Sequence, residues 1–298
     1  MNIIQEQQQQ KQQRKINLSN IINLTNHPIH DKSYIHELQQ LLQINGVITL
    51  PSFILPDPHS NLLQEAKQHQ HLAYYTKSTH NVYLTPIDKS LPLNHPFNRQ
   101  VISSKGCITT DQIPSTSILK SLYYNYQFQQ FCADLVNVAK LYPYEDPLSE
   151  INIHYYQEGQ ELGWHFDNSS FAITLLLQGP INGGHFEYIP NLRTTTRNSS
   201  NKNTIKHTNH FDEDKVVEYD KVKQVLDGKL HGQILDIDPC TLVIFRGRES
   251  LHRVSPIYGD QSRILVVFAY NDQPGVSLSE EARMTFFGRT GTSDDNKN

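Results

Sequence analysis

The chain of 298 residues is 37% hydrophobic and 19% charged, and its formal net charge is −4 at pH 7. This length allows one large domain or two small ones with a substantial buried core. Acidic and basic residues are mixed, without the basic stripe that a phosphate backbone requires, so we do not expect a nucleic acid as partner or substrate.

Neither membrane nor secretory signals are evident. The longest apolar run, residues 264–270, is far too short for a bilayer span, and the glutamine-rich N-terminal segment lacks the apolar core of a signal peptide. Cys107, Cys132 and Cys240 are widely spaced and form no C-x-x-C pair, which indicates neither a disulfide framework nor a cysteine zinc site. We therefore expect a cytoplasmic protein that does not associate with membranes.

The N-terminal part divides into a tail and a flank. Residues 1–20 are predicted to be disordered, because their polar, low-complexity run cannot bury enough apolar surface to offset the entropy of ordering. Residues 21–148 are predicted to form a helical or mixed flank that packs on the core domain. The spacing of apolar residues in this flank predicts a helix over 35–42 before Gly46, a strand over Val47–Leu50, a helix capped at Asp57-Pro58 and a helix over 128–139.

From Ser149 onward, short apolar and β-branched segments alternate with turn residues. They predict eight strands, over residues 149–156, 162–167, 171–178, 183–189, 231–237, 241–246, 251–255 and 263–271. Eight strands suit a double-sheet jelly roll. We therefore predict a mainly β protein with flanking helices, whose double-stranded β-helix (jelly-roll, cupin-like) core spans residues 149–290.

The remaining segments are connections. Residues 193–215 are rich in Asn, Thr and Lys and predict a surface insertion, which either acts as a lid or has no function. A helix over 216–226 is expected to stop at Gly228, and a helix over Glu280–Phe287 at Gly288. Residues 291–298 are predicted to be disordered.

Four polar residues stand next to these predicted strands. His165 and Asp167 form an H-x-D motif between two strands, and His252 precedes Arg263 with a Gly259-Asp260 turn between them. An H-x-D motif alone is weak evidence, because a chain with 15 histidines contains about one by chance. Their order and strand context place all four residues on one β framework.

These residue types together predict iron and 2-oxo acid chemistry. Two neutral imidazoles and one carboxylate on one face of Fe(II) leave three positions open, so a 2-oxo acid can chelate the metal and O2 can take the last position. His165, Asp167 and His252 provide that ligand set. A dicarboxylate co-substrate has a remote carboxylate, which the guanidinium of Arg263 is suited to bind through paired, charge-assisted hydrogen bonds.

The second half of the chain resembles the Fe(II)/2-oxoglutarate oxygenases. More narrowly, it is similar to the group of free-amino-acid radical halogenases and their hydroxylase relatives, with the similarity extending over residues 45–290. The stretches that carry the resemblance are Gly163-Trp164-His165-Phe166-Asp167, residues 171–178, Gly183-Gly184-His185-Phe186-Glu187-Tyr188, residues 247–254 and Phe287-Gly288-Arg289. One departure is Cys240, at a turn position where relatives usually carry glycine.

The resemblance implies a jelly-roll core, Fe(II) bound by His165, Asp167 and His252, and 2-oxoglutarate bound by the iron and Arg263. By the family pattern, Tyr156 also touches 2-oxoglutarate. The halogenases carry glycine in place of the metal-binding carboxylate, so that chloride occupies the vacant position. Because Asp167 stands at that position here, the resemblance implies hydroxylation, with formation of succinate and CO2.

A free amino acid or a similar small polar molecule is the expected substrate. Such a molecule needs a cation for its carboxylate, for which Arg99 is the candidate, and Asn168 beside the metal motif is a candidate for a further contact. Three other functions remain open at this stage. They are a prolyl- or lysyl-type hydroxylase acting on protein side chains, a non-catalytic jelly-roll protein that binds metal or ligand, and a zinc hydrolase, in which Arg263 and Tyr156 would have no role.

Overall fold

The computed structural model describes residues 17–193 and 213–291. Most of the predicted N-terminal tail, nearly all of the 193–215 insertion with its suggested lid function, and residues 292–298 lie outside the described residues. Within the tail, however, Leu18–Asn20 forms a 3-10 turn and Leu18 is buried. The predicted tail therefore extends too far, because Leu18 packs into the main core together with Ile21 and Ile22.

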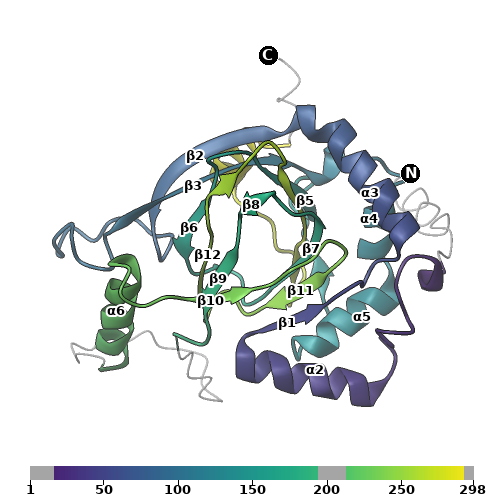
Figure 1. The fold of residues 1–298 in the computed structure, drawn as a ribbon, viewed down its shortest axis with the longest axis horizontal. Helices are drawn as coiled ribbons and strands as arrows, with labels where there is room; N and C mark the ends of the chain where they lie inside the picture. Colours follow the sequence, from purple (N-terminus) through teal and green to yellow (C-terminus); the bar gives the residue numbers. More distant parts are fainter. Residues whose placement is uncertain (1–16, 194–212, 292–298) are drawn as a thin grey trace.

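A single curled sheet of eleven strands dominates the described residues, and all of its strand pairs are antiparallel (Figure 1). Its order is β1 (Val47–Leu50), β11 (Leu242–Phe245), β7 (Ala172–Gln178), β14 (Arg263–Phe268), β5 (Ile151–Tyr156), β3 (Gln100–Ile108), β6 (Leu162–His165), β12 (Leu251–Val254), β9 (Phe186–Ile189) and β10 (Gln233–Leu235), with β2 (Tyr74–Asn81) paired to β3. Two small sheets pair β8 (Asn182–Gly183) with β13 (Ile257–Tyr258), and β4 (Tyr142–Pro143) with β15 (Tyr270–Asn271).

The predicted fold class is confirmed, and each of the eight predicted strand segments contains a strand. The N-terminal flank differs from its prediction, because it contributes β2 and β3 to the sheet in addition to β1. β3 lies between β5 and β6, so the sheet continues across the boundary that we placed at residue 149. β2 and β3 escaped prediction because β2 is a polar edge strand and β3 carries serines, a lysine and a glycine in place of an apolar alternation.

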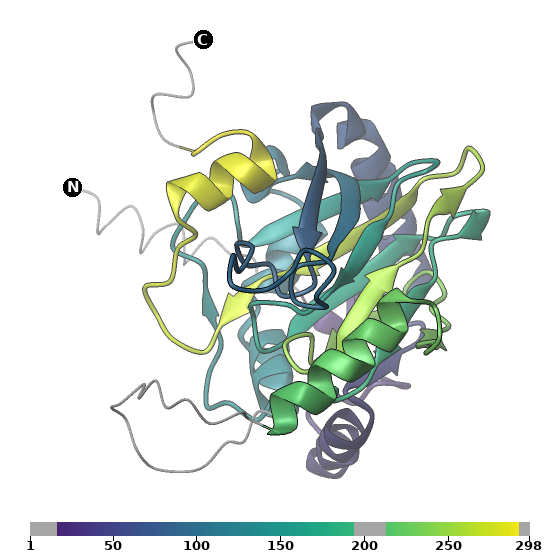
Figure 2. The same cartoon turned by 90° about the vertical axis from the view of Figure 1, so that its left-hand side faces the viewer.

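Helices cover one outer face of the sheet. They are α2 (Lys32–Asn45), α3 (Pro56–His69), α4 (Ile118–Tyr123) and α5 (Tyr126–Leu135), while α6 (Glu213–Leu226) lies apart from them on the other side of the molecule (Figures 1 and 2). α2 ends at Gly46, whose φ of 71° is in the left-handed region that glycine adopts without strain. Two predicted helix boundaries were wrong. α3 starts at Pro56 with Leu55 as its N-cap, and α5 ends at Leu135 because Asn137 turns the chain with a φ of 57°.

Alternation along the strands separates the two faces of the sheet. Ile153, Ile264 and Ile173 point outward and pack in the main core with Phe128 and Phe131 of α5. Residues at the intervening positions therefore face the interior of the curled sheet. There, Val243 and Phe245 of β11 pack against Tyr188 of β9, which is distant in the strand order, so side chains meet across the interior.

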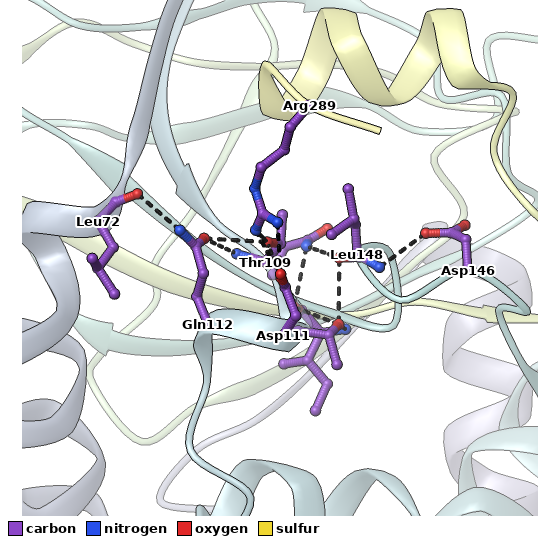
Figure 3. A network of polar contacts seen from close by, with 10 residues as sticks. Leu72, Thr109, Asp111, Gln112, Asp146, Leu148 and Arg289 are labelled. Carbon is purple, nitrogen blue, oxygen red and sulfur yellow. Dashed lines mark hydrogen bonds and ion pairs between the residues drawn. The ribbon is translucent and has the colours of Figure 1, made fainter. Parts of the chain in front are cut away.

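A polar network joins the C-terminal helix to the sheet (Figure 3). The guanidinium of Arg289, which follows α7 (Glu280–Phe287), donates to both carboxylate oxygens of Asp111 at 2.6 and 2.7 Å and to Thr109 Oγ1 at 2.5 Å. Gln112 extends the network, accepting from the Thr109 backbone N–H and donating to the Leu72 carbonyl. The end of α7 is thus held by paired, charge-assisted hydrogen bonds on the 3-10 turn (Thr110–Gln112) that follows β3.

Candidate metal centre

The strand register brings the two histidines together. His165 ends β6 and His252 is the second residue of β12, and the two are directly paired in the antiparallel ladder. Their ring centroids are 4.1 Å apart, and the residues are 6% and 4% exposed. Asp167 follows two residues after His165, where its backbone N–H donates to the Gly247 carbonyl at 3.0 Å. The pairing of β6 with β12 and the hydrogen bond from Asp167 to Gly247 therefore fix the relative positions of the three side chains.

The ligand atoms of these residues converge on one point. Asp167 Oδ1 lies 3.4 Å from His165 Nε2 and 3.5 Å from His252 Nε2. One donor atom from each of the three residues lies within 4.8 Å of the others, as binding of a single ion requires. Two imidazoles and a carboxylate on one side of an ion are the ligand set of non-heme Fe(II) oxygenases.

Backbone carbonyls set the tautomers of both histidines. His165 Nδ1 lies 2.8 Å from the Gly163 carbonyl oxygen, and His252 Nδ1 lies 3.0 Å from that of Ser250. A carbonyl oxygen only accepts, so each Nδ1 carries the proton and donates. Each Nε2 is then left with its lone pair toward Asp167, which is the arrangement typical of metal-binding histidines.

The electrostatics of the site keep its ligands ready for a cation. Burial lowers the pKa of His165 below its ordinary value, and His252 beside it acts in the same direction, so His165 is neutral at pH 7. Burial alone would raise the pKa of Asp167, but His252 and His165 outweigh it and hold that pKa well below the usual range. The site therefore offers an ionised carboxylate beside the neutral imidazole of His165.

Gly247 makes room for the carboxylate. A Cβ atom at this position would lie 1.8 Å from Asp167 Oδ2 and 2.6 Å from its Cγ, which no side chain can accommodate without displacing Asp167. The φ of Gly247 is not in the left-handed region, so the need for glycine is steric and not conformational. The Gly247 carbonyl also accepts a hydrogen bond from the backbone N–H of Asp167. Gly247 therefore both fixes the backbone of Asp167 and leaves space for its carboxylate.

Arg263 and Tyr156 face the same interior. They are directly paired between β14 and β5, are 3% and 1% exposed, and the guanidinium carbon of Arg263 lies 5.5 Å from the Tyr156 ring centroid. Arg263 Nη1 is buried and has no hydrogen-bond partner among the described residues. A buried guanidinium N–H without a partner is costly, and a carboxylate would satisfy it. This orphaned donor fits the remote carboxylate of 2-oxoglutarate.

Comparison with protein families gives one match that spans most of the chain. The model of the family described as Halogenase D matches residues 30–285. The chain belongs to the halogenase D family. A comparison with curated protein sequences gave no match.

Solved structures similar to this halogenase D family member include non-heme, α-ketoglutarate-dependent enzymes. The epimerase SnoN from nogalamycin biosynthesis is 9% identical, with 80% of this chain and 84% of that chain covered and a TM-score of 0.50. A 2OG-Fe(II) oxygenase family oxidoreductase from Burkholderia pseudomallei is 12% identical over 83% of this chain and 94% of its own, with a TM-score of 0.47. The likeness to SnoN shows the fold. The family match and the likeness in fold agree with the ligand set, which is that of non-heme Fe(II) oxygenases.

The two predicted substrate residues both contact other residues of the protein. Arg99 pairs with Asp227 at 2.5 Å and donates to the Leu226 carbonyl at the end of α6. It lines a cavity of about 350 Å³ together with Trp164 and Arg253, which lie on the outward face of β6 and β12. Asn168 directly follows Asp167, its side chain is exposed, and its backbone carbonyl accepts a hydrogen bond from Arg248 Nε at 3.0 Å. Within the described residues, all helices are too short or too polar to cross a membrane.

Sequence reasoning missed several neighbours of the site in this halogenase D family member. No role was predicted for His154, yet it faces the interior, where Lys105 Nζ contacts its ring. His80 lies beside His165 with ring centroids 6.0 Å apart, and its Nε2 hydrogen-bonds Ser103 Oγ at 2.6 Å. Lys105 and Ser103 belong to β3, which was not predicted. The alternation Ser103, Lys105, Cys107 would have placed them on one face had the strand been recognised.

Proposed function

We propose that this protein hydroxylates an unactivated C–H bond of a free amino acid or a similarly small polar molecule, converting 2-oxoglutarate to succinate and CO2. The observation that carries the proposal is the position of Asp167, whose Oδ1 lies within 3.5 Å of both ligand nitrogens. In the glycine-containing halogenases that the chain resembles, a halide takes this place. With a carboxylate there, the site has no vacancy for the halide, and we infer oxygen transfer instead.

Each polar residue of the interior has a role in this proposal. His165, Asp167 and His252 would hold Fe(II) and leave three adjacent positions open for 2-oxoglutarate and O2. Arg263 would bind the remote carboxylate of 2-oxoglutarate, with Tyr156 beside it. The bound iron, with 2-oxoglutarate and O2, supplies the oxidising chemistry, while the protein orients the reactants and excludes water.

Aromatic side chains support the exclusion of water. Phe245 packs edge-on against the His252 ring at a centroid distance of 4.7 Å, and Phe186 lies 5.6 Å from the same ring. Both belong to the strands that line the interior next to the ligands. A low-dielectric surrounding of this kind strengthens the electrostatic hold on the metal and on the co-substrate carboxylates.

The test is succinate formation by anaerobically reconstituted Fe(II) protein, given 2-oxoglutarate, O2 and chloride, across a panel of free amino acids with mass detection of products. We expect succinate that depends on one amino acid and a product heavier by one oxygen. His165→Ala and Asp167→Ala should reduce turnover by at least about a thousandfold, because each removes a metal ligand. His185→Ala is the matched control, since this exposed histidine lies outside the metal cluster.

Other outcomes would point to other functions. A chlorinated product would overturn hydroxylation. Stimulation by a peptide and by no free amino acid would favour the protein side-chain hydroxylase. An absence of any 2-oxoglutarate turnover, despite tight iron binding, would favour the non-catalytic binding protein.

A further inference from the structure

Lys105 places a second cation on the interior face of the sheet. In the pairing of β3 with β5, Cys107 lies opposite His154 and Gly106 opposite Tyr155. Alternation puts Lys105 on the same face as Cys107, and therefore on the face of His154 and Tyr156. Its Nζ lies 3.3 Å from Nδ1 and 3.2 Å from Nε2 of His154. The ammonium thus rests against an imidazole, next to the position of Arg263.

No protein carboxylate lies within ion-pairing distance of Lys105 in the part of the chain that the structure describes; only the more distant Asp167 partly offsets the lowering of the Lys105 pKa by burial. His154 cannot supply the missing negative charge. Burial, with Lys105 and Arg263 nearby, holds the pKa of His154 well below its ordinary value, so its ring is neutral. A neutral imidazole accepts one hydrogen bond from the ammonium and compensates none of its charge. Two further ammonium protons are available to another acceptor.

The anions already assigned do not account for both cations. Asp167 is the carboxylate that would bind Fe(II), and the remote carboxylate of 2-oxoglutarate would satisfy the orphaned Nη1 of Arg263. Lys105 is then left without a counterion in a partly buried position. Uncompensated buried charge is costly, so such a lysine is expected to meet an anion when the site is filled.

We propose that Lys105 is a second carboxylate-binding group of the interior, positioned by His154 and distinct from Arg263. This inference rests on the proposed function, because it assigns a partner for the organic substrate in the same site. The carboxylate belongs either to the amino acid substrate or to 2-oxoglutarate, and the charge arrangement favours the substrate. Lys105 thereby takes the role for which the sequence had suggested Arg99.

The experiment compares Lys105→Met, which removes the charge at similar length, with Lys105→Arg, which keeps it. Both are loaded anaerobically with Mn(II), and calorimetry measures the binding of 2-oxoglutarate. The binding of the stimulating amino acid and of its carboxamide is then measured in the presence of 2-oxoglutarate. We expect Lys105→Met to leave the Kd of 2-oxoglutarate within about twofold and to weaken the amino acid at least about tenfold, as loss of a partly buried charge partner does. The carboxamide should bind wild type and variant alike, and Lys105→Arg should retain most of the affinity.

The alternative outcomes are separable. A tenfold weakening of 2-oxoglutarate alone would assign the carboxylate to the co-substrate. Unchanged affinity for both ligands, with unchanged Mn(II) binding, would overturn the proposal. If Lys105→Met does not fold, equal affinity of the wild type for the amino acid and its carboxamide, together with unchanged 2-oxoglutarate binding by Lys105→Arg, would also overturn it. If no amino acid binds the wild type, the proposed function fails, and the 2-oxoglutarate titration alone decides the role of Lys105.

Discussion

Two arginines of this protein are surrounded in opposite ways. Arg289 lies at the end of α7 and makes paired hydrogen bonds to Asp111 and a further one to Thr109 (Figure 3). Arg263 is 3% exposed inside the curled sheet, yet its Nη1 has no partner among the described residues. A polar network whose groups are satisfied within the protein stabilises the fold. A buried donor that the protein leaves unsatisfied is a cost that a ligand can offset.

The same contrast, between groups satisfied within the protein and groups left for a ligand, is found among the sequence stretches that carry the family resemblance. Phe287-Gly288-Arg289 belongs to a structural joint between α7 and the 3-10 turn that follows β3, where Gly288 ends the helix with a φ of 70°. Gly247 and His252 belong to the metal centre, where the glycine admits a carboxylate and the histidine offers a lone pair. Of the stretches that carry the resemblance, one therefore stabilises the fold, and others form the metal centre.

Exchanging each arginine for methionine tests this contrast most strongly. Arg263→Met should weaken 2-oxoglutarate binding by about 2 to 5 kcal/mol, the loss typical of a buried charge partner. The free energy of unfolding of the ligand-free variant should not fall, because the removed cation had an unsatisfied donor. Arg289→Met is the matched control and should do the reverse, costing about 1 to 2 kcal/mol of stability with unchanged 2-oxoglutarate affinity. Calorimetric titration measures 2-oxoglutarate affinity, and urea unfolding measures the free energy of unfolding. Equal changes in both variants would show that Arg263 and Arg289 do not differ as a binding and a structural arginine.

The next largest effect is expected at Gly247. In Gly247→Ala the new methyl group would occupy the space of the Asp167 carboxylate, which must move away from the histidines. Displacement of one ligand should weaken Fe(II) binding about 10- to 100-fold, as changes to groups that support metal ligands do. Gly179→Ala is the control, because a Cβ there meets nothing within 4 Å and the residue has no left-handed φ. Anaerobic Fe(II) titration distinguishes them, and equal affinities would show that Asp167 is not held where the structure places it.

The sequence predicts the fold where the strands are apolar on at least one face. β7 and β14 are runs of β-branched and aliphatic residues whose neighbours cover both faces, so periodicity and composition agree. β2 has no buried face over most of its length, and its pairing with β3 is visible only in three dimensions. The turn at Cys240 likewise needs the structure to be understood. Its φ of 71° lies in the left-handed region that glycine adopts without strain, which residue identity alone left open.

The candidate site also divides into residues that strand patterns in the sequence predict and residues that only strand pairing brings together. His165, Asp167 and His252 could be predicted because they stand where recognisable strands begin or end, and the structure brings their ligand atoms together. Lys105 could not be predicted, because its relation to His154 arises from pairing between strands separated by about fifty residues. Arg99 was assigned to substrate on chemical type alone. Its ion pair with Asp227, far along the chain, directs it to the outer face instead.

The smallest predicted effect concerns the pH dependence of the Arg289 joint. Burial alone would raise the pKa of Asp111, but hydrogen bonds from Arg289 and Thr109 hold it below its ordinary value of 3.8. A carboxyl whose pKa is lower in the folded state contributes stability that is complete above about pH 4 and is lost as the pH falls through the folded value. Asp111→Asn should therefore lower the free energy of unfolding at pH 7 by only about 0.5 to 1 kcal/mol, because the pair is partly exposed and screened by solvent. Urea unfolding of the metal-free protein should show this difference shrinking below pH 4. A difference that stays constant from pH 7 to pH 3 would mean that Asp111 acts through packing, and the Arg289 joint would then not be the electrostatic counterpart of the Arg263 site.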